Sequence, residues 1–205
     1  MPFELSIVQM MRAPLFAALM VTLIAGATAL ERATAATISL SAGLSALPNI
    51  GKVVQSSPTS TGTFRVDAST GGVSVISGTL TRVSAGSVAV PTYTVICKNG
   101  SGAVNACGSG LSTVTVSVHN PVAATAATIA AFNATVAPGI GASSCSAISG
   151  QNSTNLSFSC VLNNGNPGNN NTETVATISL GMDISILSVA NTGQQNPGYT
   201  VTTSP

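Results

Sequence analysis

Charged and aromatic residues are scarce in this chain. Only 5% of its 205 residues are charged, 3% are aromatic, and it contains one histidine and no tryptophan. Soluble domains commonly carry about 25% charged residues, so hydroxyl and amide groups must hydrate this surface instead. A nucleic-acid interface needs clustered lysine and arginine to displace the counterions of phosphate. The few scattered bases exclude such a partner and also exclude a basic membrane-surface helix.

Catalytic side chains are equally scarce. Nucleophilic catalysis needs a base beside the nucleophile and a group that orients the base. The only histidine, His119, ends a predicted strand and is interpreted as an outward-facing polar residue. After the first 35 residues the acids are Asp67, Glu173 and Asp183, which do not predict the carboxylate pair of a glycosidase. We therefore predict a protein that is not an enzyme and needs no cofactor.

The first 35 residues have the pattern of a secretory signal peptide. Arg12 precedes the apolar run 15–24, and two small-residue cleavage sites follow that run. A run of about ten apolar residues is too short to cross a hydrocarbon core, which needs about 20. Cleavage after Ala29 or Ala35 would leave no transmembrane segment in the mature chain. We expect a secreted protein, located in the periplasm, on the outer surface or in the medium, with its folded domain over residues 36–205.

Four cysteines fit an exported chain, because an oxidising compartment permits disulfides. Their order, Cys97, Cys107, Cys145 and Cys160, allows three connectivities. We favour Cys97–Cys107 and Cys145–Cys160, because each pair encloses a short, turn-rich segment. Metal binding is the competing interpretation, but the chain has no C-x-x-C motif and a single histidine. Two disulfides and no metal site are therefore expected.

Alternation of apolar and polar residues dominates the remaining sequence and predicts antiparallel strands. Residues 112–119 are the clearest case, with valines at every second position that would share one buried face. Residues 73–83 predict one long strand with a bulge or bend at Gly78. The alanine-rich segment 121–132 remains undecided between helix, strand and loop. Further strands are expected at 37–40, 63–67, 88–97, 153–162, 174–180, 184–189 and 199–203.

Turn-forming residues separate these strands at short intervals, as in 69–72 and 163–168. Many short β-branched strands with such turns between them predict a sandwich or a barrel. Neither a strict internal repeat nor a linker interrupts the pattern. We therefore predict an all-β protein consisting of one antiparallel β-sandwich, Ig-like or pilin-like, after an N-terminal signal helix.

Three segments carry a resemblance to a known family: 64–78, 91–95 and 193–201. They supply a glycine-rich early hairpin, a Pro-Thr-Tyr-Thr-Val strand and a closing strand that begins with Gly-Tyr. In this pattern the chain resembles the secreted bacterial proteins grouped as domain of unknown function 4402, near the spore-coat-U-like and pilin-like β-sandwiches. The resemblance implies a cell-surface or fimbria-like structural role, and it supplies no catalytic residue.

These observations together lead us to expect a structural subunit or adhesin of the bacterial cell surface. It would associate with itself or with other surface proteins by strand addition at an open sheet edge. The exchangeable segment would be Thr37–Leu40 or Tyr199–Thr203. The alternative is a monomeric secreted module that binds a surface glycan or a protein partner, with 163–171 as its binding loop.

Overall fold

The computed structural model of the chain describes residues 37–44, 47–98, 107, 111–163, 172–188 and 194–205. The chain divides into two compact units, Met1–Thr34 and Ala35–Pro205, and only the second contains described residues. The predicted signal helix and both predicted cleavage sites lie outside the described residues, as does most of the loop 163–171.

The described residues form twelve strands and no helix. The strands are β1 (Thr37–Leu44), β2 (Val53–Val54), β3 (Gly62–Val66), β4 (Val73–Gly78), β5 (Thr81–Arg82), β6 (Thr92–Lys98), β7 (Thr113–Val122), β8 (Ala127–Pro138), β9 (Ala142–Cys145), β10 (Leu156–Leu162), β11 (Thr172–Ile186) and β12 (Gly198–Ser204). This content confirms the predicted all-β class.

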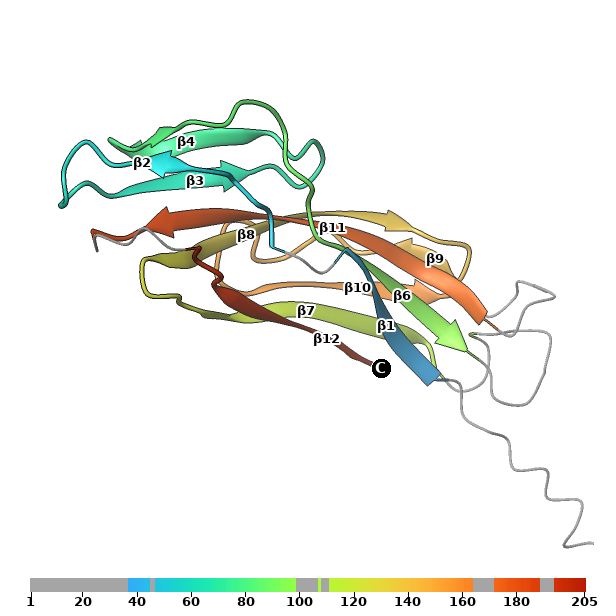
Figure 1. Ribbon diagram of the computed structural model, residues 1–205. Coiled ribbons are helices and arrows are strands. Elements are labelled where there is room, and N and C mark those ends of the chain that lie inside the picture. The colour runs from blue at the N-terminus through green and yellow to red at the C-terminus, as the bar shows by residue number, and fades with distance from the viewer. Residues whose placement is uncertain (1–36, 45–46, 99–106, 108–110, 164–171, 189–193) are drawn as a thin grey trace, which may run out of the picture. The chain divides into compact units, whose positions relative to one another are not determined.

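Ten of the strands build two antiparallel sheets (Figure 1). The larger sheet is centred on β11, which pairs with β8 along one side. Along its other side β11 pairs first with β6 and then with β3, and β1 and β4 flank these two strands. The smaller sheet has the order β12-β7-β10-β9, while β2 and β5 form a separate two-stranded pair.

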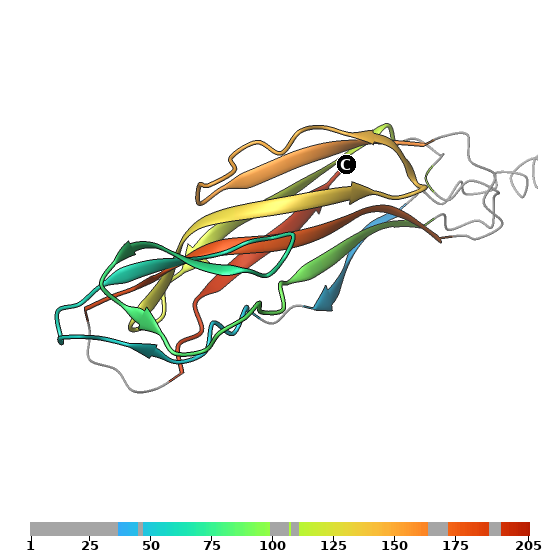
Figure 2. The same cartoon turned by 90° about the horizontal axis from the view of Figure 1, so that it is seen from above.

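The inner faces of the two sheets share one hydrophobic core. As the alternation predicted, Val114, Val116 and Val118 of β7 are fully buried, and they face side chains such as Phe132 and Ile178 of the larger sheet. Figure 2 shows the two layers from above. The predicted β-sandwich is therefore confirmed. Its core consists mainly of aliphatic side chains, in keeping with the low aromatic content.

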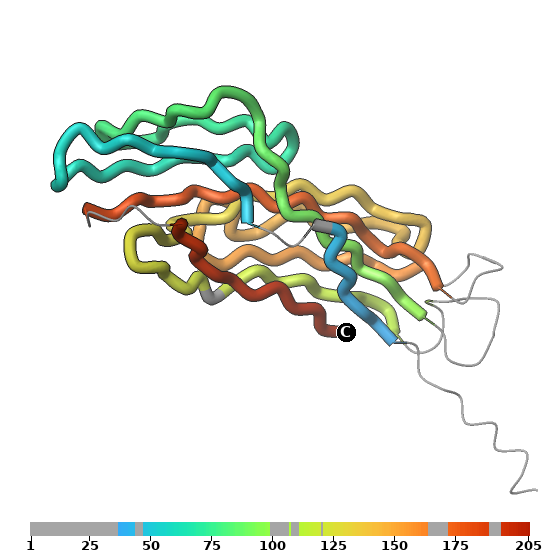
Figure 3. Tube along the Cα trace, viewed as in Figure 1, coloured from blue at the N-terminus to red at the C-terminus, as the bar shows by residue number. Residues whose placement is uncertain are grey.

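The predicted strands need two corrections. Residues 73–83 are not one strand: the chain turns at Gly78, whose φ is +89°, and a Cβ there would collide with the main chain of Thr61 and Gly62. Residues 174–180 and 184–186 belong to one strand, β11, which ends at Ile186 and can be followed in Figure 3 as one continuous tube. The segment 121–132, which the sequence left undecided, contains the end of β7, the connection 123–126 and the start of β8.

β11 changes its neighbour from β6 to β3 at Gly181. Asn133, the register partner of Gly181 on β8, spans this point with its side chain. Its Nδ2 donates to the carbonyl of Val66 at 3.1 Å, and its Oδ1 accepts from the N–H of Ala68 at 2.9 Å. A Cβ on Gly181 would lie only 2.6 Å from the Ala68 nitrogen and closer still to Asn133 Oδ1. Glycine at this position therefore leaves the room that the Asn133 amide needs.

Candidate functional site

β1 is an edge strand with a single neighbour. It pairs with β6 from Thr37 to Leu44, and no described strand is hydrogen-bonded to its other edge. Ile38 and Leu40 are half-buried and pack against the core, whereas the alternate residues are exposed. Natural edge strands are commonly protected by charge, proline or bulges. β1 contains no charged residue and no proline, and its one register shift lies near its end, between Ala42 and Leu44.

β12 is an edge strand of the smaller sheet and pairs only with β7. It is also free of charge and proline. Tyr199 anchors it to the opposite sheet, because its hydroxyl lies 2.7 Å from that of Tyr93 and its ring packs edge-on against Phe132. Burial, followed by the hydrogen bond with Tyr93, raises the pKa of Tyr199 well above its ordinary value of 10.0. The tyrosine therefore stays neutral and holds β12 in place.

The two edge strands β1 and β12 lie side by side on one flank of the sandwich (Figure 1). We call β1 and β12 together the open flank. Each strand presents an outer row of main-chain N–H and C=O groups without a described strand partner. Such rows are the usual template for adding a further strand.

The edge of β8, at the other side of the larger sheet, is covered by the segment 151–153. The N–H of Phe132 donates to the carbonyl of Ser153, and the N–H of Asn152 donates to the carbonyl of Phe132, both at 2.8 Å. The side chain of Gln151 completes the cover: its Oε1 accepts from the N–H of Ala134 at 3.0 Å and its Nε2 donates to the carbonyl of Ala134 at 2.8 Å. These four hydrogen bonds occupy main-chain groups that an added strand would need.

Both cysteine pairs are joined as the sequence predicted. Cys145 of β9 and Cys160 of β10 are register partners on adjacent strands and form one disulfide. Cys97, near the end of β6, is bonded to Cys107. No free cysteine is present among the described residues. The disulfides therefore fix one edge of the smaller sheet and one end of the larger sheet.

Asp67 and Asp183 both serve structural contacts. Asp183, 7% exposed, accepts two hydrogen bonds of 2.8 Å from Nε and Nη2 of Arg65 on the neighbouring strand β3. Asp67 accepts from the Ser69 hydroxyl at 2.6 Å and from the N–H of Thr70 at 2.8 Å, in the turn that joins β3 to β4. These hydrogen bonds, with that of the Ser69 hydroxyl the strongest, lower the pKa of Asp67 to about 2. Both carboxylates are therefore engaged in hydrogen bonds within the fold.

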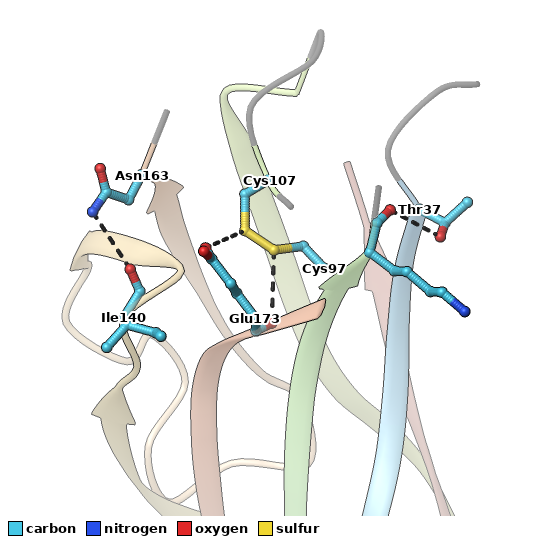
Figure 4. Close-up of a disulfide and its surroundings, with 7 residues drawn as sticks. Thr37, Cys97, Cys107, Ile140, Asn163 and Glu173 are labelled. Carbon is cyan, nitrogen blue, oxygen red and sulfur yellow. Dashed lines mark hydrogen bonds between the residues drawn. A yellow bond between two sulfur atoms is a disulfide. The ribbon is translucent and has the colours of Figure 1, made fainter. Parts of the chain in front are cut away.

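Glu173 is the third acid, and its environment differs from the other two. It is 3% exposed and lies beside the Cys97–Cys107 disulfide (Figure 4). The sequence contains a signal for this burial, because Glu173 has the same parity on β11 as the buried Val175. Its nearness to the sulfurs has no such signal. Glu173 is the one carboxylate of the described chain that has cysteine sulfurs as close neighbours.

His119 lies in a shallow hollow of about 410 Å³ on the smaller sheet. Its Nε2 is 3.3 Å from the hydroxyl of Thr202, and the ring is half-buried. The lining residues are otherwise mostly hydroxyl and amide side chains: Ser117, Ser149, Asn155, Ser157 and Thr202. No carboxylate lines the hollow, so the histidine has no acid there to orient it. Sequence reasoning did not foresee this hollow, because its residues come from four separate segments.

A second hollow, of about 470 Å³, surrounds Arg82. The guanidinium is already engaged, because Nε donates to the carbonyl of Ile50 at 2.6 Å and Nη1 donates to the carbonyl of Gly86 at 2.9 Å. Arg82 therefore ties β5 to the segment before β2 and to the loop that follows β5.

Two further findings bear on function. Within the described residues, no helix is long and apolar enough to cross a membrane. No protein-family model, curated protein or solved structure matches this chain. The function must therefore be argued from the geometry of the chain itself.

Proposed function

We propose that the protein is an exported, non-catalytic structural subunit or adhesin of the bacterial cell surface, which associates by strand addition at the open flank. The observation that carries this proposal is the difference between the two flanks. The edge of β8 is covered by hydrogen bonds from the segment 151–153, whereas no described strand is hydrogen-bonded to the outer edges of β1 and β12. The secretory pattern of the first 35 residues and the two disulfides support an oxidising compartment outside the cytoplasm.

β1 is the better exchangeable segment of the two. It holds to the sandwich through its ladder with β6 and through two half-buried side chains, Ile38 and Leu40. β12 is held more firmly, because Tyr199 packs against both Tyr93 and Phe132. The same segment from a second copy would place the same two apolar side chains in the same positions. Exchange of an identical element between copies costs little, because the incoming strand restores the ladder and the packing of the outgoing one.

The test measures self-association of the mature protein, residues 36–205. Light scattering after gel filtration, over a hundredfold range of concentration, should show dimers or longer oligomers. Replacing Ser39 and Ser41 with lysine should abolish oligomers in which one β1 edge is added to another, because both side chains are exposed on β1 and added charge disfavours edge pairing. Oligomers that exchange β1 should persist, because the incoming strand keeps both lysines exposed. The matched control replaces Ser143 and Ser144 of β9 with lysine. Both are exposed at the other side of the smaller sheet, and their replacement should leave association unchanged.

A synthetic peptide of residues 37–44 gives a second measurement. It should bind a variant that lacks this segment more tightly than it binds the intact protein, because β6 then has a free edge. Two results together would contradict the proposal. The wild-type protein would stay monomeric at every concentration, and neither the intact protein nor the variant without residues 37–44 would bind the peptide.

The hollow around His119 favours a second candidate function, a monomeric binding module for a surface glycan. Hydroxyl and amide side chains line it and would match the hydrogen-bonding groups of a sugar. A glycan array with the monomeric protein tests this alternative. Binding that is lost in Asn155→Ala and kept in the Ser39/Ser41 lysine variant would favour it over assembly.

A further inference from the structure

The Cys97–Cys107 disulfide and Glu173 form a buried cluster at one end of the larger sheet (Figure 4). Both cysteines are fully buried and Glu173 is 3% exposed. The two sulfurs and one carboxylate oxygen all lie within 4.8 Å of one another. Glu173 and Cys97 are also register partners on β11 and β6, so the sheet itself holds them together whether or not the disulfide is present.

The hydrogen-bonding groups of this cluster do not match in the oxidised protein. The Oε2 of Glu173 is 3.7 Å from the sulfur of Cys107, and its main-chain carbonyl oxygen is 3.6 Å from the sulfur of Cys97. A thiol would donate at both distances, but a disulfide sulfur carries no proton. Within the described residues the other carboxylate oxygen, Oε1, has no hydrogen-bond partner. Buried acceptors without donors are unfavourable, so a proton-bearing or positively charged group would stabilise this cluster, and the described residues supply none to Oε1.

We propose that reduction of the Cys97–Cys107 disulfide opens a site for a thiophilic divalent cation, with Zn²⁺ as the best match. Two thiolates and one carboxylate are ligands that Zn²⁺ takes in proteins, and its fourth position would be left to water. The oxidised protein is closed to the cation, because the sulfurs are bonded to each other. The site would therefore be controlled by the redox state and is independent of the function proposed above.

A dithiol can reduce the Cys97–Cys107 disulfide by thiol–disulfide exchange. The dithiol gives two electrons and two protons, the bond between the two sulfurs breaks, and the reductant leaves as its own disulfide. Cys97 and Cys107 are then thiols. Binding of the cation releases the two thiol protons to the solvent, because thiolates are the metal ligands. Glu173 adds its carboxylate from the position that it already holds.

The second disulfide provides an internal comparison. Cys145 and Cys160 have no carboxylate or histidine that would complete a cation site in the described chain. If a pair of thiols alone sufficed, both pairs would bind the cation after reduction. If Glu173 is needed, only the pair Cys97 and Cys107 would bind.

The experiment titrates the mature protein with Co²⁺, whose thiolate complexes absorb in the near ultraviolet. The protein is reduced with dithiothreitol and freed of reductant under anaerobic conditions. One equivalent of Co²⁺ should produce the thiolate absorption, Zn²⁺ should remove it, and the oxidised protein should give none. Glu173→Gln should weaken binding more than about tenfold. Replacing Cys145 and Cys160 with serine should leave it unchanged.

Reduction could lower the stability of the fold, so a second measurement compares the Tm of the reduced protein with and without Zn²⁺. Zn²⁺ should raise its Tm, because a cation that binds the folded state stabilises it. Absence of both the absorption and the Tm shift would overturn the proposal. So would equal affinity in Glu173→Gln, or binding that survives replacement of Cys97 and Cys107 with serine.

Discussion

Replacement of Gly181 with alanine tests the point at which β11 changes neighbours. The added Cβ would lie 2.6 Å from the nitrogen of Ala68 and closer still to Asn133 Oδ1 and the Val66 carbonyl oxygen. Three neighbouring groups would therefore have to move at once. Overpacking of a closed site costs about 1–3 kcal/mol, and each of the two hydrogen bonds of Asn133 contributes about 1 kcal/mol. We expect Gly181→Ala to lower the free energy of unfolding by about 3 kcal/mol or more.

Urea unfolding followed by circular dichroism measures this loss, because the chain has no tryptophan to report by fluorescence. Gly198→Ala is the matched control: it also lies in a strand, but its Cβ would make ordinary contact with Val122 at 3.6 Å. The free energy of unfolding of Gly198→Ala should be unchanged or should rise by up to about 1 kcal/mol, because alanine restricts the unfolded chain more than glycine does. A loss below about 1 kcal/mol for Gly181→Ala, or an equal loss in the control, would refute this reasoning.

Three further predictions concern hydrogen bonds of single side chains. Asp183→Ala should lower the free energy of unfolding by about 1–2 kcal/mol in urea, because it leaves the half-exposed Arg65 without its two hydrogen bonds. The lowered pKa of Asp67 stabilises the fold above pH 3.8, and this contribution should disappear as the pH falls towards 2. Between about pH 5 and pH 2, the Tm of Asp67→Asn should therefore change less with pH than the Tm of the wild type. Gln151→Ala should free the main chain of Ala134 and increase aggregation of the heated protein in light scattering, whereas Gln194→Ala, which is exposed elsewhere, should not.

The sandwich was predictable because alternation is a local signal. The valines of β7 and the Phe158–Cys160–Leu162 face of β10 follow it, and both are buried as expected. The unity of β11 was not predictable, because Gly181 and Asp183 are residues that strands usually avoid. Partners distant in the sequence make them acceptable: Asn133 needs the space at Gly181, and Arg65 pairs with Asp183. The first half of β8 stayed undecided between helix, strand and loop, because its alanines and threonines have no clear period of their own.

The candidate sites divide in the same way. The cysteine pairing followed from the short, turn-rich segments that each pair encloses, and the two segments proposed for strand addition are both edge strands. The protection of the β8 edge could not be predicted from the sequence, because it depends on hydrogen bonds between the side chain of Gln151 and the main chain of Ala134. The position of Glu173 beside the Cys97–Cys107 disulfide could not be predicted, because Glu173 and Cys107 are 66 residues apart in the sequence and only the folded sheet brings them together.

The position of β11 near the end of the sequence has a consequence for the order of folding. β3, β6 and β8 all leave the ribosome before β11 does, yet each of them pairs with β11. Until Thr172 and the residues after it have emerged, the larger sheet has no centre and its earlier strands have open edges. A chain dominated by such distant pairings folds slowly, and its exposed strands aggregate readily meanwhile. Any chain truncated before β11 should therefore fail to fold, and full-length chains should need protection until their last strands arrive.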